Sequence, residues 1–259
     1  MWQWFSRAAV SSETADWMAE CFSWAMQNFD VERFRNTTPL ILPTDKFFPE
    51  RIDNPSTMAN YILQQVVSYS GLQSWPWRLV TDYHFEPVEP PLLGLNYAVR
   101  GDDASGLNLM MGAHGPQELI VAFTIDQITK PQDLVATMAH GVAQHMLWQS
   151  QLIPPGGPAY FLQAAEVLAV FMGFGVMVTN SAYNFRGSCA RCYNPRANRQ
   201  SSLSESECLY ALALFCHLKK IDRRDAGKHL KKYLLDAFKT AERQVIKHPC
   251  TSQLQQLSV

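Results

Sequence analysis

The sequence predicts an α+β protein with N-terminal helices, a small mixed sheet, and a helical C-terminal half. Apolar residues recur at helical spacing before Gly71 and again after Pro131, and short β-forming segments separated by Pro or Gly lie between them. With 259 residues, of which 47% are apolar, the chain can bury a large core. A short disulfide scaffold and a long disordered chain are therefore excluded. We expect one domain over 1–259, with an α/β part over about 1–150 and a helical part over about 151–259.

Two helices are expected in the first 71 residues. Helical spacing of apolar residues predicts one over Ser12–Phe29. The segment Thr38–Glu50 holds a short apolar run closed by a proline, which favours a brief strand followed by an irregular loop. Asn54 can cap a second helix that has Pro55 at its first position and ends at Gly71.

The middle of the chain has the composition of strands. Four short segments are rich in β-forming residues and are separated by Pro or Gly clusters, which predicts three or four strands of one sheet. These segments are Trp77–Phe85, Leu95–Arg100, Leu107–Gly112 and Glu118–Ile125.

The second half of the chain is predicted to be helical. Ser204 and Glu207 form a capping box at the start of one of its helices. The most apolar stretch, Val167–Val178, is 12 residues long. Because crossing a bilayer takes about 20 apolar residues, we interpret this stretch as a buried helix and expect no membrane segment. The expected helices are Asp133–Gln149, Tyr160–Ala182, Leu203–Lys220 and Ala226–His248, the last with an apolar stripe of Leu230, Tyr233, Leu234, Phe238, Ala241 and Val245.

Charge is unevenly distributed along the chain. The formal net charge is −1, but Lys219–Lys247 holds ten basic and four acidic residues, so this segment carries +6 and the rest carries −7. The basic segment is either a surface for an acidic partner or the solvated face of a terminal helix. Its aromatic residues, Tyr233 and Phe238, are expected on the apolar side, so base stacking and nucleic-acid binding are not supported.

The stretch Asp133–Gln149 resembles the central helix of the zincin metallopeptidases. In that family the helix carries His-Glu-x-x-His, whose two histidines reach one zinc ion because residues four apart lie on one helical face. The Glu activates the metal-bound water. The corresponding five residues here are His140, Gly141, Val142, Ala143 and Gln144.

The resemblance extends over about Thr38–Phe215 and is to a group of bacterial zincin-like proteins. It is carried by the segments LPTDKFFPE, VATMAH, AAEVLAVFMGFGV and LSESECLYALALF. It implies a zincin-like fold. It also implies that a carboxylate on the following helix completes the metal site, and the corresponding residue is Glu166, 22 residues after Gln144.

The changed motif predicts a domain without peptidase activity. An amide at Gln144 is a poor zinc ligand compared with imidazole, and no carboxylate at Gly141 can take a proton from bound water. His145 lies five residues after His140 and is therefore turned by about 140° from it, so the two cannot share an ion without a distorted helix. No catalytic residue is expected. Gly141 marks the vestigial base position, and His140, Gln144 and Glu166 mark the vestigial metal site, with His145 nearby.

Three functions follow from this interpretation. The first is a pseudoenzyme that binds or regulates an unidentified protein or peptide partner in the old cleft. The second is a metal-dependent hydrolase with a rearranged ligand set at His140 and Glu166, helped by His145 or a cysteine. The third is an interaction module that uses the basic C-terminal helix. A purely structural role also stands: His140 is then a hydrogen-bonded core residue, and Glu166 is an acid that favours the first turn of its helix.

The cysteines offer a separate metal hypothesis. Cys189 and Cys192 form a Cys-x-x-Cys pair, which is half of a structural zinc site or a pair of ordinary loop cysteines. His217 and Cys250 are distant partners that no spacing selects. The first residues do not have the pattern of a secretory signal, so we expect a cytoplasmic protein with reduced thiols. No cofactor other than zinc is expected.

Overall fold

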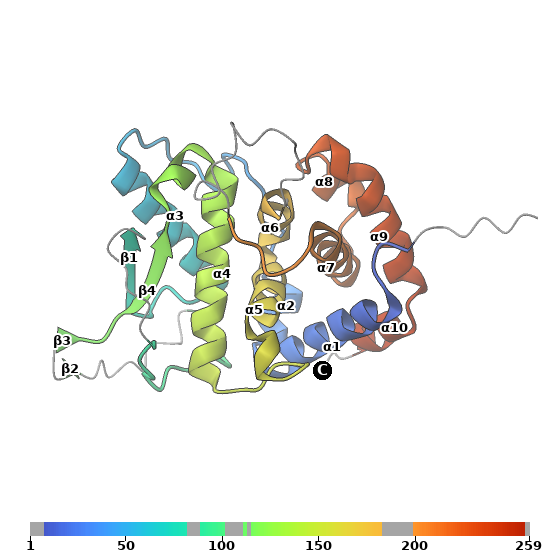
Figure 1. The fold of residues 1–259 in the computed structure, drawn as a ribbon, viewed down its shortest axis with the longest axis horizontal. Coiled ribbons are helices and arrows are strands. Elements are labelled where there is room, and N and C mark those ends of the chain that lie inside the picture. Colours follow the sequence, from blue (N-terminus) through green and yellow to red (C-terminus); the bar gives the residue numbers. More distant parts are fainter. Residues whose placement is uncertain (1–7, 82–88, 102–110, 113–114, 183–198, 257–259) are drawn as a thin grey trace, which may run out of the picture.

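The computed structural model describes residues 8–81, 89–101, 111–112, 115–182 and 199–256. The chain is a mostly helical α+β protein, as Figure 1 shows. Its α-helices and β-strands are α1 (Ser12–Asn28), α2 (Val31–Asn36), α3 (Pro55–Ser70), β1 (Trp77–Thr81), β2 (Met111–Gly112), β3 (Gly115–Pro116), β4 (Leu119–Phe123), α4 (Pro131–Ser150), α5 (Phe161–Ala169), α6 (Gly175–Ser181), α7 (Glu205–Leu218), α8 (Arg223–Gly227), α9 (Leu235–Lys247) and α10 (Pro249–Gln256).

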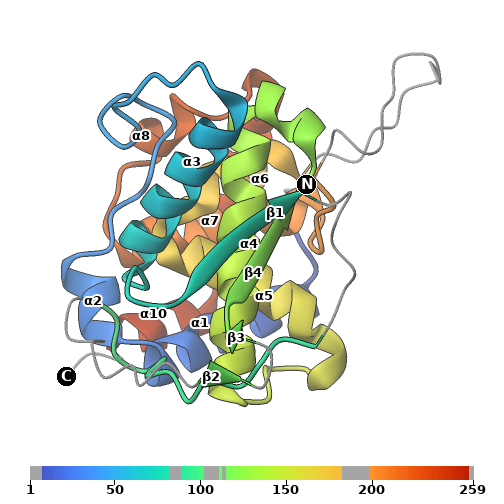
Figure 2. The ribbon, with the colours of Figure 1, turned by 90° about the vertical axis from the view of Figure 1, so that its left-hand side faces the viewer.

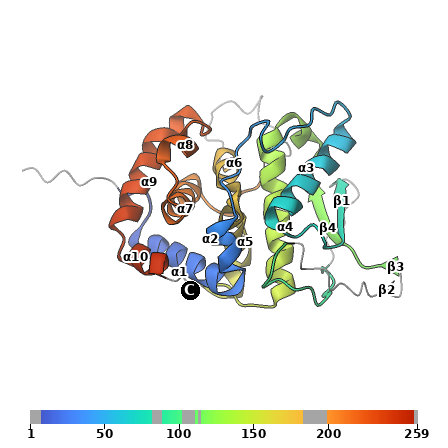
Figure 3. The ribbon, with the colours of Figure 1, turned by 180° about the vertical axis from the view of Figure 1, so that it is seen from behind.

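Helix α4 lies in the middle of the molecule and is buried on most of its surface. The pair β1 and β4 covers one side of it together with α3, and α5 and α6 pack on the other side (Figure 2). Helix α1 packs against α5, α7 and α10, so segments before and after residue 150 share one hydrophobic core. Figure 3 shows α1, α9 and α10 grouped at the end of the molecule away from the sheet.

The helices predicted before residue 71 and at Ser204 are confirmed, together with their capping residues. The Asn54 Oδ1 accepts a hydrogen bond from the Thr57 backbone N–H at 3.0 Å, and Gly71 ends α3 with a left-handed φ of 70°. At α7, the Ser204 N–H donates to the Glu207 carboxylate at 2.7 Å, and the Glu207 N–H donates to the Ser204 hydroxyl at 3.3 Å.

The prediction of one sheet with three or four strands is wrong for the described residues. Strands β1 and β4 pair in parallel, while β2 and β3 form a separate antiparallel pair. No strand forms over Leu95–Arg100, where the Asn96 Oδ1 accepts from the N–H groups of Ala98 and Val99 at 3.2 and 3.4 Å. Such local side-chain bonds compete with a strand ladder. Residues 82–85 and 107–110 lie outside the described residues.

The brief strand expected within Thr38–Glu50 is also absent. One backbone contact of this segment accompanies a break in the core helix. The predicted helix Tyr160–Ala182 is divided into α5, a π-helical turn over Val170–Phe174, and α6. The Ile41 N–H donates to the Gly173 carbonyl at 3.0 Å, so this carbonyl bonds to the incoming segment instead of the helix. Gly173 has a φ of 103°, and a Cβ there would overlap the Pro39 carbonyl oxygen.

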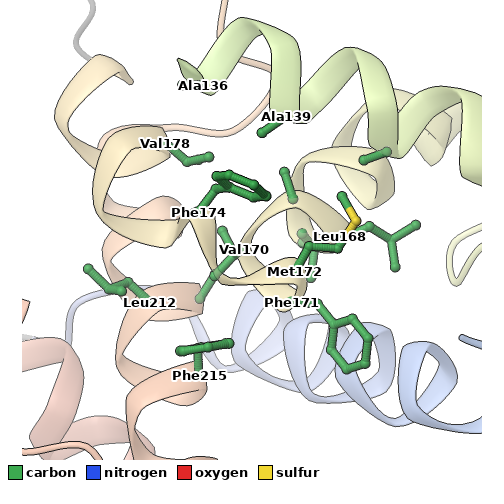
Figure 4. Packing of buried hydrophobic residues seen from close by; sticks show 14 of the residues in the cluster. Ala136, Ala139, Leu168, Val170, Phe171, Met172, Phe174, Val178, Leu212 and Phe215 are labelled. Carbon is green, nitrogen blue, oxygen red and sulfur yellow. The ribbon is translucent and has the colours of Figure 1, made fainter. Parts of the chain in front are cut away.

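Two aromatic side chains of the π-helical turn point to different sides of the core. Figure 4 shows Phe174 pointing toward Ala139 of α4 while Phe171 points toward the opposite side. There Phe171 stacks on Phe34, with ring centroids 4.3 Å apart. The helical run Pro158–Ser181 has 24 residues and a mean hydropathy of 1.9, enough in length and composition to cross a membrane. Because 83% of its most apolar window is buried inside the protein, it serves as the core helix, which is compatible with a soluble protein.

The predicted helix Ala226–His248 is wrong in its first part. Only α9 is a long helix, and it follows α8 and a 3₁₀ turn. Buried Asn180 explains the interruption, because its amide donates to the His229 carbonyl at 2.8 Å and accepts from the Lys231 N–H at 3.0 Å. Tyr233 consequently lies 58% exposed instead of in the apolar stripe.

Candidate functional site

Helix α4 directs the motif residues toward two different neighbours. The His140 Nε2 lies 3.1 Å from the Leu162 carbonyl oxygen at the start of α5, and the Gln144 side-chain amide lies 3.3 Å from the same nitrogen. His145 instead faces β4, where its Nε2 lies 2.7 Å from the Ile120 carbonyl oxygen. The structure therefore brings His140 and Gln144 together and gives His145 a separate partner.

The surroundings of His140 favour one neutral form of its ring. A carbonyl oxygen can only accept, so the proton of the ring must be on Nε2 for the bond to Leu162 to form; the Gln144 amide nitrogen, itself a donor, then touches Nε2 without a hydrogen bond to it. Burial lowers the pKa of His140, while the nearby Glu166 carboxylate raises it to a lesser degree. The ring is therefore neutral near pH 7, and Nε2 is engaged as a donor rather than free to bind an ion.

His145 is buried and bonded through one ring nitrogen, Nε2, while its Nδ1 has no hydrogen-bond partner among the described residues. Burial lowers its pKa, and the hydrogen bond to Ile120 acts in the opposite direction. The edge of its ring meets the Trp77 ring, with centroids 5.6 Å apart. These contacts place His145 between the helix and the two-stranded sheet.

Gly141 allows α4 to approach the sheet closely. A Cβ built at this position would lie 3.2 Å from the Val121 Cγ1 of β4, which is tighter than ordinary van der Waals contact. A Glu at position 141, as in the zincin motif, would bring its Cβ into close contact with the Val121 side chain. Helix-to-strand packing is thus a sufficient physical reason for glycine here.

Glu166 is fully buried, and its carboxylate is occupied by hydrogen-bond donors. It forms an ion pair with Arg199, whose side chain is 2% exposed. It also accepts from the Ser201 hydroxyl at 2.8 Å and from the backbone N–H groups of Ser202 and Leu203 at 2.6 and 3.1 Å. These donors neutralise the charge and connect α5 to the segment that leads into α7.

The dipole explanation for Glu166 is wrong. Helix α5 begins at Phe161 and has no acidic residue in its first turn, so Glu166 lies too far along it to benefit from its N-terminus. Arg199 and Ser201 were not identified from the sequence. A single Arg and a Ser in a polar segment carry no spacing signal, and only the tertiary fold brings them to α5.

The cysteines described by the structure are free thiols: Cys21, Cys208, Cys216 and Cys250. The Cys208 Sγ lies 3.9 Å from the Glu166 carboxylate. Burial first and the Glu166 charge second raise the pKa of Cys208, so it stays a neutral thiol. Cys189 and Cys192 lie outside the described residues.

A cavity of about 400 Å³ opens at the other end of α4. The loop between α2 and α3 forms one wall, and α3 and the first turns of α4 form the others. Apolar side chains of Phe48, Met58 and Tyr61 line it together with charged residues of the loop. The loop contains the whole segment LPTDKFFPE that contributes to the family resemblance.

Comparisons with known proteins leave the family open. The chain matches no protein-family model, no curated protein and no solved structure.

Proposed function

We propose that this chain is a zincin-like domain without peptidase activity, which binds a protein or peptide partner in the cytoplasm. The observation that carries the proposal is that two of the three side chains of the vestigial metal site, His140 and Glu166, are committed to internal bonds. His140 is bonded to Leu162, and Glu166 is bonded to Arg199 and to the backbone before α7. Gly141 has no carboxylate to activate water.

The energies support this function over a hydrolase with a rearranged ligand set. To bind an ion, Glu166 would have to give up Arg199. Leaving one member of a buried ion pair without its partner costs about 3–5 kcal/mol. The loss of the general base would lower the rate by a further factor of about 10² to 10⁴. A structural network is the more stable use of the same side chains.

A peptidase assay with metal titration tests the absence of activity. The full-length protein, with and without added zinc, is expected to hydrolyse a mixed fluorogenic peptide pool no faster than buffer. Zinc-dependent hydrolysis that is lost in His140→Gln and retained in His217→Gln would instead establish the hydrolase. His217 is a suitable control because it lies on α7, where its Nε2 is 2.9 Å from the Gln255 amide.

The cavity is the binding place that we propose for a peptide. Among the residues that line the cavity, the acidic Asp45, Glu50 and Asp53 outnumber the basic Arg51, so a basic peptide with an apolar side chain matches the charge of the cavity and its apolar lining. A labelled Arg/Leu-rich peptide pool should bind, and an equivalent Glu/Leu-rich pool should bind much less. Met58→Lys should abolish binding by filling the cavity with a repelling charge, whereas Gln64→Lys on the exposed side of α3 should not. Equal binding by Met58→Lys would remove the cavity from the proposal.

The basic C-terminal segment supports a second, weaker candidate, an interaction module. Part of the segment is used internally: the Lys219 ammonium donates to the Phe34 carbonyl and to the Arg35 carbonyl, and Arg223 pairs with Glu242 at 3.3 Å. Lys239, Arg243 and Lys247 are exposed on α9. Replacing these three with Glu should abolish salt-sensitive binding to polyglutamate if this surface is used. Deleting the whole segment is a poor test, because α9 contributes buried residues to the core.

A further inference from the structure

The two ends of the described chain bring three different metal-binding side chains together. Asp16 lies on α1, His248 ends α9, and Cys250 lies in the first turn of α10. One potential ligand atom from each lies within 4.8 Å of the other two. The His248 Nε2 is 3.3 Å from the Asp16 carboxylate oxygen.

The fold explains why these residues meet. His248 has an extended backbone (φ −75°, ψ 128°), and Pro249 then starts α10, so the chain turns sharply between two helices. Helix α10 packs against both α1 and α7. This turn therefore presents His248 and Cys250 to the exposed side of α1, where Asp16 lies.

The cluster contains a buried polar atom that the protein does not satisfy. The His248 side chain is 9% exposed. Its Nε2 faces Asp16, while its other ring nitrogen, Nδ1, is buried and has no hydrogen-bond partner within the described part of the chain, as is also true of the His145 Nδ1. Buried polar groups in native proteins are almost always bonded, and a water or an ion accounts for many of the exceptions.

We propose that Asp16, His248 and Cys250 form a zinc site that joins α1 to the turn between α9 and α10. A thiolate, an imidazole and a carboxylate are the three ligand types that zinc combines, whereas magnesium and calcium select oxygen alone. Zinc–ligand bonds of about 2.0–2.3 Å in a tetrahedral site place ligand atoms about 3–4 Å apart, so the three side chains need only small rotations to close on an ion. The fourth position is open to water, because the Asp16 side chain is 62% exposed.

A metal at this site would stabilise the folded state. This role is independent of the proposed peptide-binding cavity. The site links the first described helix to the last, two segments more than 200 residues apart in sequence. A ligand that binds only the folded state stabilises that state in proportion to its concentration over its dissociation constant. Zinc should therefore raise the melting temperature of this protein.

Cobalt provides the test, because a cobalt–thiolate bond gives a charge-transfer absorption band in the near ultraviolet. The full-length protein is reduced, stripped with a chelator, and titrated with Co²⁺ and then with Zn²⁺. We expect one equivalent of cobalt to produce the band and zinc to remove it. Cys250→Ser should lose the band, and Asp16→Asn should weaken zinc binding about tenfold or more. Glu20→Gln, which neutralises another exposed acid of α1, is the matched control and should bind as the wild type does.

The Cys-x-x-Cys loop is the competing location for a metal. A double variant, Cys189→Ser with Cys192→Ser, should retain the cobalt band and the zinc-induced rise in melting temperature. Persistence of the band in Cys250→Ser and its loss in the double variant would overturn the proposal and place the ion in the loop. A wild-type protein that takes up less than one equivalent of either metal would overturn it as well. Because Asp16 is exposed, Asp16→Asn keeps the test valid even if Cys250→Ser folds poorly.

Discussion

The surroundings of His140 and of His248 differ in what the imidazole rings and the carboxylates beside them contact. His140 lies at the position that a family motif marks, yet its Nε2 bonds to Leu162, and nearby Glu166 is fully paired. His248 belongs to no motif, yet it lies beside a carboxylate and a thiol and keeps a buried nitrogen without a partner. We therefore expect a metal at the cluster around His248 and not at the motif position. The convergence of three possible ligand atoms, and not an unsatisfied nitrogen by itself, distinguishes the two places.

The largest expected effect tests whether Glu166 is truly committed to structure. Glu166→Gln should lower the free energy of unfolding by about 3–5 kcal/mol, because it leaves the Arg199 guanidinium buried without a charge partner. Urea denaturation followed by circular dichroism measures this. The double variant Glu166→Gln with Arg199→Met should recover much of the loss. If Glu166→Gln were as stable as the wild type, the carboxylate would be available to a ligand and the contrast with His248 would disappear.

A smaller effect is expected at Gly141. Gly141→Ala gains up to about 1 kcal/mol of helix propensity but forces Val121 aside, and overpacking of this kind costs about 1–3 kcal/mol. We expect a net loss of about 1 kcal/mol in thermal or urea unfolding. In a Val121→Ala background the same substitution should become stabilising, because the methyl group then has room. Stabilisation in both backgrounds would show that close packing does not explain the glycine.

The smallest effect concerns pH. Burial lowers the pKa of both His140 and His145 below the ordinary value of 6.5, so the unfolded chain binds more protons than the folded chain just below that pH. The free energy of unfolding should therefore fall as the pH drops from 6.5 through the lowered values. The urea midpoint should be lower at pH 5.5 than at pH 7.5. His145→Gln should reduce that difference, and an unchanged difference would mean that folding does not lower the pKa of His145.

Local signals in the sequence were sufficient for several helices. Asn54, Pro55 and Gly71 act within a few residues of one another, and so do Ser204 and Glu207, which explains why both predictions are confirmed. The predictions of a strand over Leu95–Arg100 and of a continuous helix over Ala226–His248 were wrong for a different reason. Their apolar patterns are compatible with regular structure, but Asn96 and Asn180 bond to the backbone instead.

The candidate site divides in the same way. Its residues on α4, His140 and Gln144, could be named because this stretch resembles the motif helix of the zincins. The partner of Glu166 could not, because Arg199 is 33 residues away and reaches α5 only when the chain folds back. The Asp16, His248 and Cys250 cluster is an extreme case, since no local pattern relates α1 to α10.

The sequence by itself determined the α+β class, the positions of the main helices and the absence of the zincin motif's Glu and second His. Tertiary structure alone decided which polar atoms are satisfied, where the core helix breaks, and which side chains from distant segments meet. The physical reason is one of range. Helix caps and periodicity depend on residues within a few positions, whereas ion pairs, close backbone contacts and shared ligands depend on packing between segments that the sequence does not place next to each other.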